Sequence, residues 1–156
     1  NRLFALEGVL AVMLREQLRE ELGGVYGVGV NANESYWPDD RYSVTVSFTC
    51  DPDRVDELVS ATVDTIRALR TDGPSAEHVA QEQEKNRSER ETQLRDNSFW
   101  LSAFSGALKR GVDPHALLDW DARNDALTPA LVQQTATELL DPDAMIEVRL
   151  LPEAAP

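Results

Sequence analysis

Two histidines and one cysteine are the side chains of this sequence that could bind zinc through nitrogen or sulfur. His78 and His115 lie far apart in the chain, and neither is close to Cys50. Nucleophilic catalysis by the Cys50 thiol is not expected, because no histidine nearby in the sequence could take its proton. The sequence therefore predicts no metal site, a core position for Cys50 and surface positions for both histidines.

The net charge narrows the possible partners. The sequence has 156 residues, with 15 Lys and Arg against 28 Asp and Glu, which gives a net charge of −13 at pH 7. Such a surface repels phosphate backbones and anionic lipids, so we expect no binding to nucleic acid. No apolar run reaches the roughly 18 to 20 residues that span a bilayer, so no membrane insertion is expected. The length suits one domain, and the start at Asn1 suggests a piece of a longer protein.

The first third of the chain predicts a helix followed by a β-hairpin. Apolar residues recur at spacings of three and four over residues 3–22, which is typical of an amphipathic helix, and Gly23 and Gly24 end it. Two runs of alternating residues follow, over 26–33 and 42–50, and predict an antiparallel hairpin with one buried face. On the first strand, Tyr26, Val28, Val30 and Ala32 share the apolar face.

The remainder predicts helices and one closing strand. Capping side chains, in three cases followed by proline, predict helices over residues 53–70, 75–110, 114–126 and 129–140. Ile146, Val148 and Leu150 alternate with charged residues and predict a strand, and residues 152–156 predict a frayed tail. The expected fold class is α+β, an antiparallel sheet of hairpin plus C-terminal strand packed against helices. Three strands are too few to cover these helices, so the first strands of the sheet are expected upstream of residue 1.

The end of the first helix is the most specific feature. It continues into a strand of small residues through the segment Leu18-Arg19-Glu20-Glu21-Leu22-Gly23-Gly24-Val25-Tyr26-Gly27-Val28. This segment is similar to the signature of the non-catalytic half of the pitrilysin-type, or inverzincin, zinc metallopeptidases. The hairpin, the Asp-Pro-capped helix, the Gly-Pro break and the segment Asn97-Ser98-Phe99-Trp100-Leu101 follow in the order of such a domain. The resemblance covers nearly the whole chain and is greatest for bacterial periplasmic zinc proteases.

The resemblance implies which half of such an enzyme this chain forms. The family has two homologous halves around a chamber, and the zinc site lies in the N-terminal half, on a helix with His-x-x-Glu-His, which this sequence lacks. The C-terminal half supplies an arginine and, seven positions later, a tyrosine to the substrate backbone. Arg19 and Tyr26 match that spacing, with Gly23 and Gly24 as the turn between them. A guanidinium and a phenol are donors suited to a peptide carbonyl or an oxyanion.

Simpler interpretations of these residues stay open. Arg19 is also explained as a cation at the C-terminal end of a helix, and Tyr26 as a core or rim residue. Trp37, in the loop between the strands, has either no special role or a contact with substrate or a neighbouring domain.

The predicted long helix has two unlike halves. Residues 81–93 contain no aliphatic or aromatic side chain, and pairs such as Lys85 and Glu89 are spaced for ion pairs on a solvated face. In the architecture of the family, this stretch could instead face the chamber or the opposite half. Phe99, Trp100 and Phe104 are expected in the core.

We therefore expect residues 1–151 to form the substrate-binding, catalytically inactive C-terminal half of a zinc metalloendopeptidase that degrades peptides. Zinc would belong to the N-terminal half of the same protein, and this chain alone should have no peptidase activity. The alternatives are a scaffold domain of an inactive relative and an acidic protein-interaction module. The isolated chain is expected to expose a strand edge and to self-associate. The resemblance favours the bacterial periplasm or cell envelope as the compartment.

Overall fold

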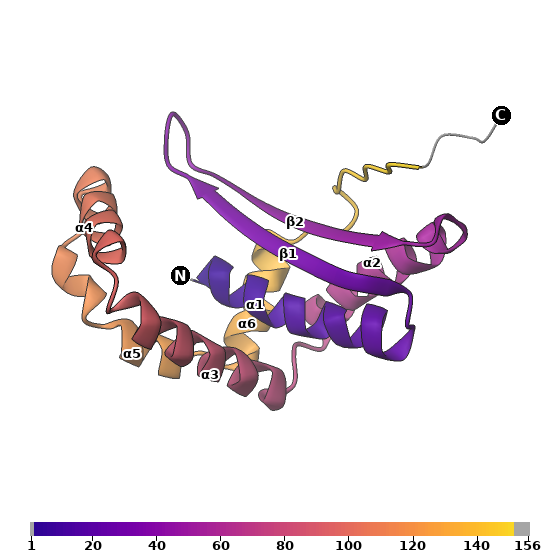
Figure 1. Ribbon diagram of the computed structural model, residues 1–156, viewed down its shortest axis with the longest axis horizontal. Helices are drawn as coiled ribbons and strands as arrows, with labels where there is room; N and C mark the ends of the chain where they lie inside the picture. The colour runs from indigo at the N-terminus through magenta and orange to yellow at the C-terminus, as the bar shows by residue number, and fades with distance from the viewer. Residues whose placement is uncertain (1, 152–156) are drawn as a thin grey trace.

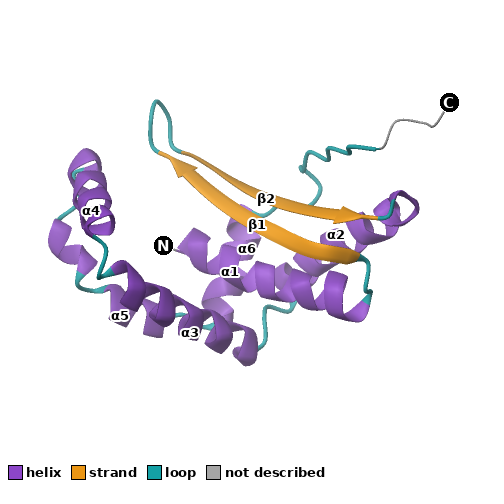
Figure 2. Ribbon diagram, viewed as in Figure 1, coloured by secondary structure: helices purple, strands orange, loops and turns teal. Residues whose placement is uncertain are grey.

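The computed structural model describes residues 2–151 (Figure 1). Helix α1 (Arg2–Leu14) continues into a π-helical segment, η1 (Arg15–Glu21), and then into a hairpin of β1 (Val25–Ser35) and β2 (Arg41–Cys50). The elements that follow are η2 (Pro52–Arg54), α2 (Val55–Thr71), α3 (Ala76–Gln93), α4 (Asn97–Arg110), η3 (Pro114–Leu117), α5 (Trp120–Asp125) and α6 (Pro129–Leu139). The expected α+β class is confirmed (Figure 2).

Helix α1 lies at the centre of the fold, in contact with β1, α2, α3 and α6 (Figure 1). Its sequence is apolar on nearly every side, and a helix of that kind is stable only when other elements surround it. Each fully buried leucine or valine contributes about 1.5–3 kcal/mol relative to exposure. The fully buried apolar side chains of α1 are Leu3, Leu6, Val9, Leu10 and Leu14.

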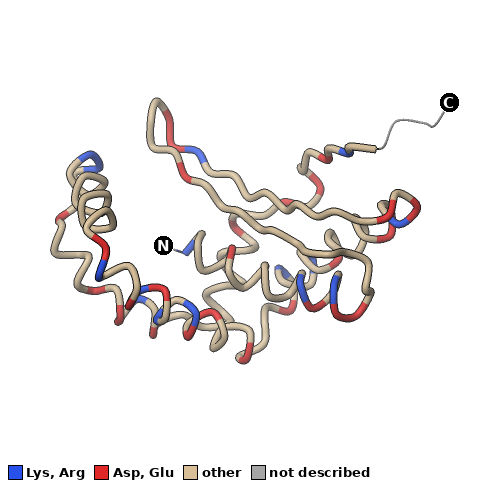
Figure 3. The backbone as a smooth tube through the Cα atoms, viewed as in Figure 1, with Lys and Arg blue, Asp and Glu red and all other residues tan. Residues whose placement is uncertain are grey.

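The hairpin packs one face against the helices and leaves the other face polar. The two strands are antiparallel, with Val30 opposite Val46 and Ala32 opposite Val44. The asparagines and serines of the strands are exposed, and the strand residues that contact the core are Val25, Val28, Val30, Val44, Val46, Phe48 and Cys50. No charged residue lies in the middle of either strand, whereas both signs of charge follow the helices (Figure 3). The predicted hairpin with one buried face is confirmed.

The predicted C-terminal strand is wrong. The sheet of the described residues has two strands, and residues 146–150 pair with neither. Ile146, Val148 and Leu150 are each at least 80 % exposed, while Arg149 forms an ion pair with Asp56 at the start of α2. An alternating segment becomes a strand only where it pairs with a neighbouring strand, and residues 146–150 form no ladder with β1 or β2. The predicted tail, 152–156, lies outside the described residues.

The predicted helix over residues 75–110 is two helices. The side chain of Asp96 accepts hydrogen bonds from the backbone N–H and the hydroxyl of Ser98, at 2.9 and 2.7 Å. Asp96 is therefore an N-cap, which ends α3 and starts α4 in a new direction (Figure 1). The predicted stop at Gly111 is confirmed by its left-handed backbone, with φ of 65°.

The polar stretch of α3 packs against α5 through hydrogen bonds. This stretch is therefore not exposed to solvent on every side. The Gln83 side-chain amide donates to the carbonyl of Asn124, at 2.9 Å, and the Asn124 side-chain amide donates back to the carbonyl of Gln83, at 3.1 Å. Arg87 reaches Asp125 at 2.8 Å. Asn124 is 5 % exposed, so these bonds satisfy polar groups that the contact removes from water.

The aromatic residues of α4 do not join the core, contrary to the prediction. Helix α4 lies beyond the end of α3, away from α1, and packs on η3 (Figure 1). Phe99 and Trp100 contact each other edge to face, with ring centroids 5.4 Å apart, and Phe104 stacks on Trp100 at 5.7 Å. These rings form a separate cluster because the break at Asp96 turns the helix away from the core.

A buried carboxylate lies where α3 crosses α1. Glu82 is 2 % exposed, and its carboxyl group occupies the space that a side chain at Gly8 would fill, since a Cβ there would lie 2.0 Å from Glu82 Cδ. Burial raises the pKa of Glu82, while Lys85, whose Nζ lies 3.3 Å from Oε2, opposes this in part. Glu89, on the same helix, adds to the rise.

Replacement of this carboxylate should stabilise the fold at neutral pH. The pKa of Glu82 is higher in the folded chain than in the unfolded chain, so ionisation of this group favours unfolding. The stability that Glu82 contributes is therefore present below the unfolded-state pKa and is lost as the pH rises through the folded-state pKa. We expect Glu82→Gln to raise the melting temperature at pH 7 by roughly 2–4 °C, about 1 kcal/mol for a domain of this size, and to flatten the fall in stability above about pH 4.

Thermal unfolding at pH 4 to 8 measures both effects. Glu84→Gln is the matched control, because Glu84 lies on the same helix and is exposed. A Glu82→Gln chain less stable than wild type at pH 7 would contradict a net cost of the buried charge.

Candidate functional site

Arg19 lies in the last turn of η1, where the helix widens. The π-helical hydrogen bond runs from the N–H of Leu22 to the carbonyl of Gln17, at 3.1 Å. Leu18 is fully buried and fixes this turn to the core, whereas Arg19 is exposed. Among the described residues, the Arg19 guanidinium has no hydrogen-bond or ion-pair partner. Its donors are therefore available to a ligand.

The turn between Arg19 and Tyr26 depends on both glycines. Gly23 has a left-handed backbone, with φ of 57°, and the N–H of Gly24 donates to the carbonyl of Leu18, at 2.9 Å. Gly24 is buried, and a Cβ there would lie 2.4 Å from Cδ2 of Leu58 on α2. The chain therefore turns from η1 into β1 against the surface of α2, with no room for a side chain at Gly24.

A β-bulge turns Tyr26 away from the core. Val25 pairs with Cys50 and Val28 with Phe48, so two residues of β1, Tyr26 and Gly27, stand opposite one residue of β2. The extra residue shifts the alternation, and Tyr26 is 90 % exposed while Val25 takes the buried position. The prediction that Tyr26 shares the buried face of Val28 is wrong for this reason. The structure thus brings Arg19, Gly23, Gly24 and Tyr26 to one junction between η1 and β1.

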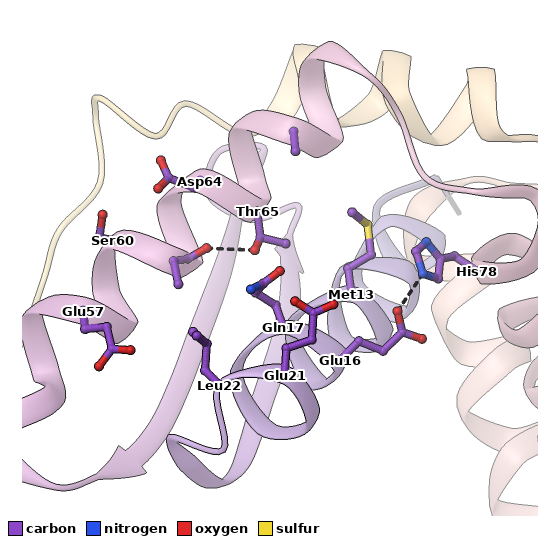
Figure 4. Close-up of a pocket in the computed structure, with 12 residues that line it drawn as sticks. Met13, Glu16, Gln17, Glu21, Leu22, Glu57, Ser60, Asp64, Thr65 and His78 are labelled. Carbon is purple, nitrogen blue, oxygen red and sulfur yellow. Dashed lines mark hydrogen bonds and ion pairs between the residues drawn. The ribbon is translucent and has the colours of Figure 1, made fainter.

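A groove of about 720 Å³ lies beside this junction, between η1, α2 and the start of α3 (Figure 4). Its apolar lining includes Met13 and Leu22. Neither Arg19 nor Tyr26 is among the described residues that line it. The groove is not predictable from the sequence, because its polar residues come from separate elements and share no motif. Its acidic side chains are Glu16, Glu21, Glu57 and Asp64.

The two histidines have different environments. His78 is half-buried at the groove, where its Nε2 lies 2.8 Å from Oε2 of Glu16 and its Nδ1 accepts a hydrogen bond from the N–H of Ser75, at 3.3 Å (Figure 4). The predicted surface position is right for His115, which is exposed, and holds only in part for His78. His78 serves in the capping box of α3, a role that its position three residues after Ser75 could have indicated.

The remaining candidates are Cys50 and Trp37. Cys50 is half-buried at the end of β2 and packs against the core, as predicted. Trp37 is 85 % exposed at the tip of the hairpin, next to Tyr36, whose ring lies under the guanidinium of Arg110 at 5.4 Å. The described residues contain no cluster of three His, Cys, Asp or Glu side chains that could hold a metal ion. No helix within residues 2–151 is long and apolar enough to cross a membrane.

Comparison with known families gives the class of protein, an inactive domain of a peptidase. The family described as "Peptidase M16 inactive domain" matches residues 4–86, which include α1, the hairpin, α2 and the first half of α3. The chain belongs to this family. A curated relative, "Zinc protease PQQL-like" of Arabidopsis thaliana, is 29 % identical over 98 residues, which are 60 % of this chain and 10 % of the relative.

Solved structures share the fold over most of the chain. The periplasmic protease PqqL of Escherichia coli is 25 % identical, with a TM-score of 0.69 over 88 % of this chain. A peptidase M16 inactive domain from Pseudomonas fluorescens has a TM-score of 0.72 over 90 % of this chain at 13 % identity. The ferredoxin protease FusC, solved in complex with Arabidopsis ferredoxin, has a TM-score of 0.70 over 90 % at 20 % identity, and these last two likenesses establish the fold alone.

This chain spans a small part of the proteins that it matches. It covers 15 % of the PqqL chain, 35 % of the Pseudomonas chain and 16 % of the FusC chain. The relatives named as proteases are therefore much longer than the domain that residues 2–151 form.

The packing of the turn predicts unequal effects of two glycine substitutions. Gly24→Ala places a methyl group against Leu58 and should destabilise the chain by about 1–3 kcal/mol, as overpacking of a core does. Gly27→Ala, in the bulge, is the matched control, because nothing lies within 4 Å of a Cβ placed there, and it should change stability by less than about 0.5 kcal/mol. Urea unfolding of both variants measures this, and equal losses would contradict the described packing.

Proposed function

We propose that this chain is the substrate-binding, catalytically inactive C-terminal half of a zinc metalloendopeptidase, and that Arg19 and Tyr26 bind the substrate backbone. One observation carries the proposal. Two strong donors lie exposed on either side of a turn that is packed against the core, and two local irregularities, the π-helical turn and the bulge, leave them in solvent.

The chemistry of the two side chains suits a peptide. The Arg19 guanidinium presents several N–H donors in a fixed plane, and the Tyr26 hydroxyl presents one O–H donor. Such donors stabilise the negative charge that develops on a carbonyl oxygen when a peptide bond is attacked. Residues Gly23 and Gly24 support the geometry of the turn and offer no further side-chain donor.

The comparisons with longer relatives support the remaining parts of the proposal. The curated relative is named a zinc protease, and the residues described here do not form a site for zinc, so we place the metal in the N-terminal half of the same protein. The FusC structure holds a polypeptide, ferredoxin, which supports a polypeptide substrate. PqqL is a periplasmic protease, which supports the cell envelope as the compartment.

Loss of either donor should slow turnover and leave zinc binding unchanged. In the full-length protein, we expect Arg19→Lys and Tyr26→Phe each to lower kcat on a peptide substrate by roughly 10²-fold, the usual effect of removing one oxyanion donor. Turnover and zinc content of the same preparations measure this.

The controls are Arg15→Lys, on the same helical segment, and Tyr36→Phe, at the hairpin tip, and both should retain activity. Full activity of the Arg19 and Tyr26 variants would reject the assignment. A full-length protein without His-x-x-Glu-His would instead favour the scaffold function.

We further propose that the isolated chain self-associates, because the backbone edges of its sheet are exposed. The sheet of the described residues has two strands, and the apolar side of residues 146–150 is exposed. We expect sedimentation to show concentration-dependent dimers, and we expect the double variant Ile146→Lys/Val148→Lys to weaken them at least several-fold. Leu101→Lys/Leu118→Lys, an equally charged double change at two other exposed apolar residues, is the control. A strictly monomeric wild-type chain would contradict self-association.

A further inference from the structure

Arg54 connects the start of α2 to the turn between Arg19 and Tyr26. Its Nη2 donates to the carbonyl oxygen of Leu22, at 3.2 Å. Leu22 is the C-cap residue of η1, and carbonyl groups at a helix end lack partners within the helix. Arg54 therefore supplies a hydrogen bond to the backbone between the two proposed substrate donors.

The guanidinium of Arg54 is held in one orientation by Glu57. Its Nε donates to Oε2 and its Nη2 to Oε1 of Glu57, both at 2.9 Å. Because this pair is bidentate and planar, it fixes the direction of the second Nη2 hydrogen, which points at Leu22. A lysine ammonium has no such fixed plane and would not reproduce the arrangement.

The guanidinium also lies against the second glycine of the turn. A Cβ at Gly24 would lie 3.2 Å from Nη1 of Arg54 and closer still to the side chain of Leu58, one turn further along α2. The turn is thus held by a hydrogen bond on one side and by close packing on the other. Among the described residues, Arg54 is the side chain that contacts the turn in both ways.

We propose that Arg54, oriented by Glu57, is a positioning residue that sets the geometry of Arg19 and Tyr26 at the substrate. The inference rests on the proposed function. Without this contact the carbonyl of Leu22 turns to water, and the segment that joins the two donors gains freedom. A displacement of about 1 Å in a positioning group can cost up to roughly 10²-fold in rate.

Hydrogen exchange of the 156-residue chain tests the structural step without any activity. We expect Arg54→Lys and Glu57→Gln to speed exchange of the Gly24 amide, which bonds to the carbonyl of Leu18, by roughly tenfold or more. Amides in the middle of the hairpin should keep their wild-type protection. Arg67→Lys is the matched control, because Arg67 lies on α2 and, like Arg54, pairs with an acidic residue three positions away, Asp64.

Kinetics of the full-length protein test the functional step. We expect Arg54→Lys and Glu57→Gln to lower kcat on a peptide by roughly tenfold, with a smaller change in KM and unchanged zinc content, and Arg67→Lys to behave as wild type. Unchanged exchange at Gly24, or faster exchange with unchanged kcat while Arg19→Lys remains impaired, would overturn the positioning role. If Arg19→Lys and Tyr26→Phe themselves keep full turnover, the proposed function fails, and the positioning role is overturned with it even where exchange is faster.

Discussion

The burial of α1 is the constraint on which the rest of this structure depends. The helix has polar side chains at few positions, so it is stable only with the hairpin on one side and α2, α3 and α6 around the others. These contacts fix its axis along its whole length. The π-helical segment η1 continues from it, and Leu18 anchors that segment in the same core. The position of Arg19 is therefore set by the core, although its side chain is exposed.

Local chemistry allowed most helices to be predicted from the sequence. Capping residues such as Asp51, Ser75 and Thr128 act on backbone groups within a few positions, and the structure confirms the helix starts that they indicate. The closing strand could not be predicted correctly, because pairing depends on a neighbour that alternation does not reveal. The prediction that the aromatic end of the long helix is buried was wrong for a related reason. The apolar spacing of this helix end predicts burial of Phe99 and Trp100, whereas the cap at Asp96 starts a new helix in another direction.

The candidate site was predictable in part. The resemblance to a peptidase domain selected Arg19 and Tyr26, and the two glycines indicated a sharp turn. The bulge was not predicted, because the alternation of Tyr26, Val28 and Val30 is unbroken in the sequence and gives no sign of an extra residue. The signal present was Gly27, since a glycine inside a strand often marks a bulge. The contact of Arg54 with Leu22 joins residues far apart in the chain, and no local pattern encodes it.

Two departures from regular structure flank the turn, and each has a consequence for one donor. In a strand without the bulge, Tyr26 would share the face of Val28, which packs against the core, and its hydroxyl would need a partner inside the protein. The bulge gives that buried position to Val25 instead. The widened turn of η1 likewise keeps Leu18 buried and closes onto Gly24, so the chain reverses within a few residues of Arg19. Bulges and π-helical turns are both enriched at functional sites, where they redirect side chains. The regular core therefore holds the junction in place, and the irregular turns on either side of it leave both donors available to a ligand.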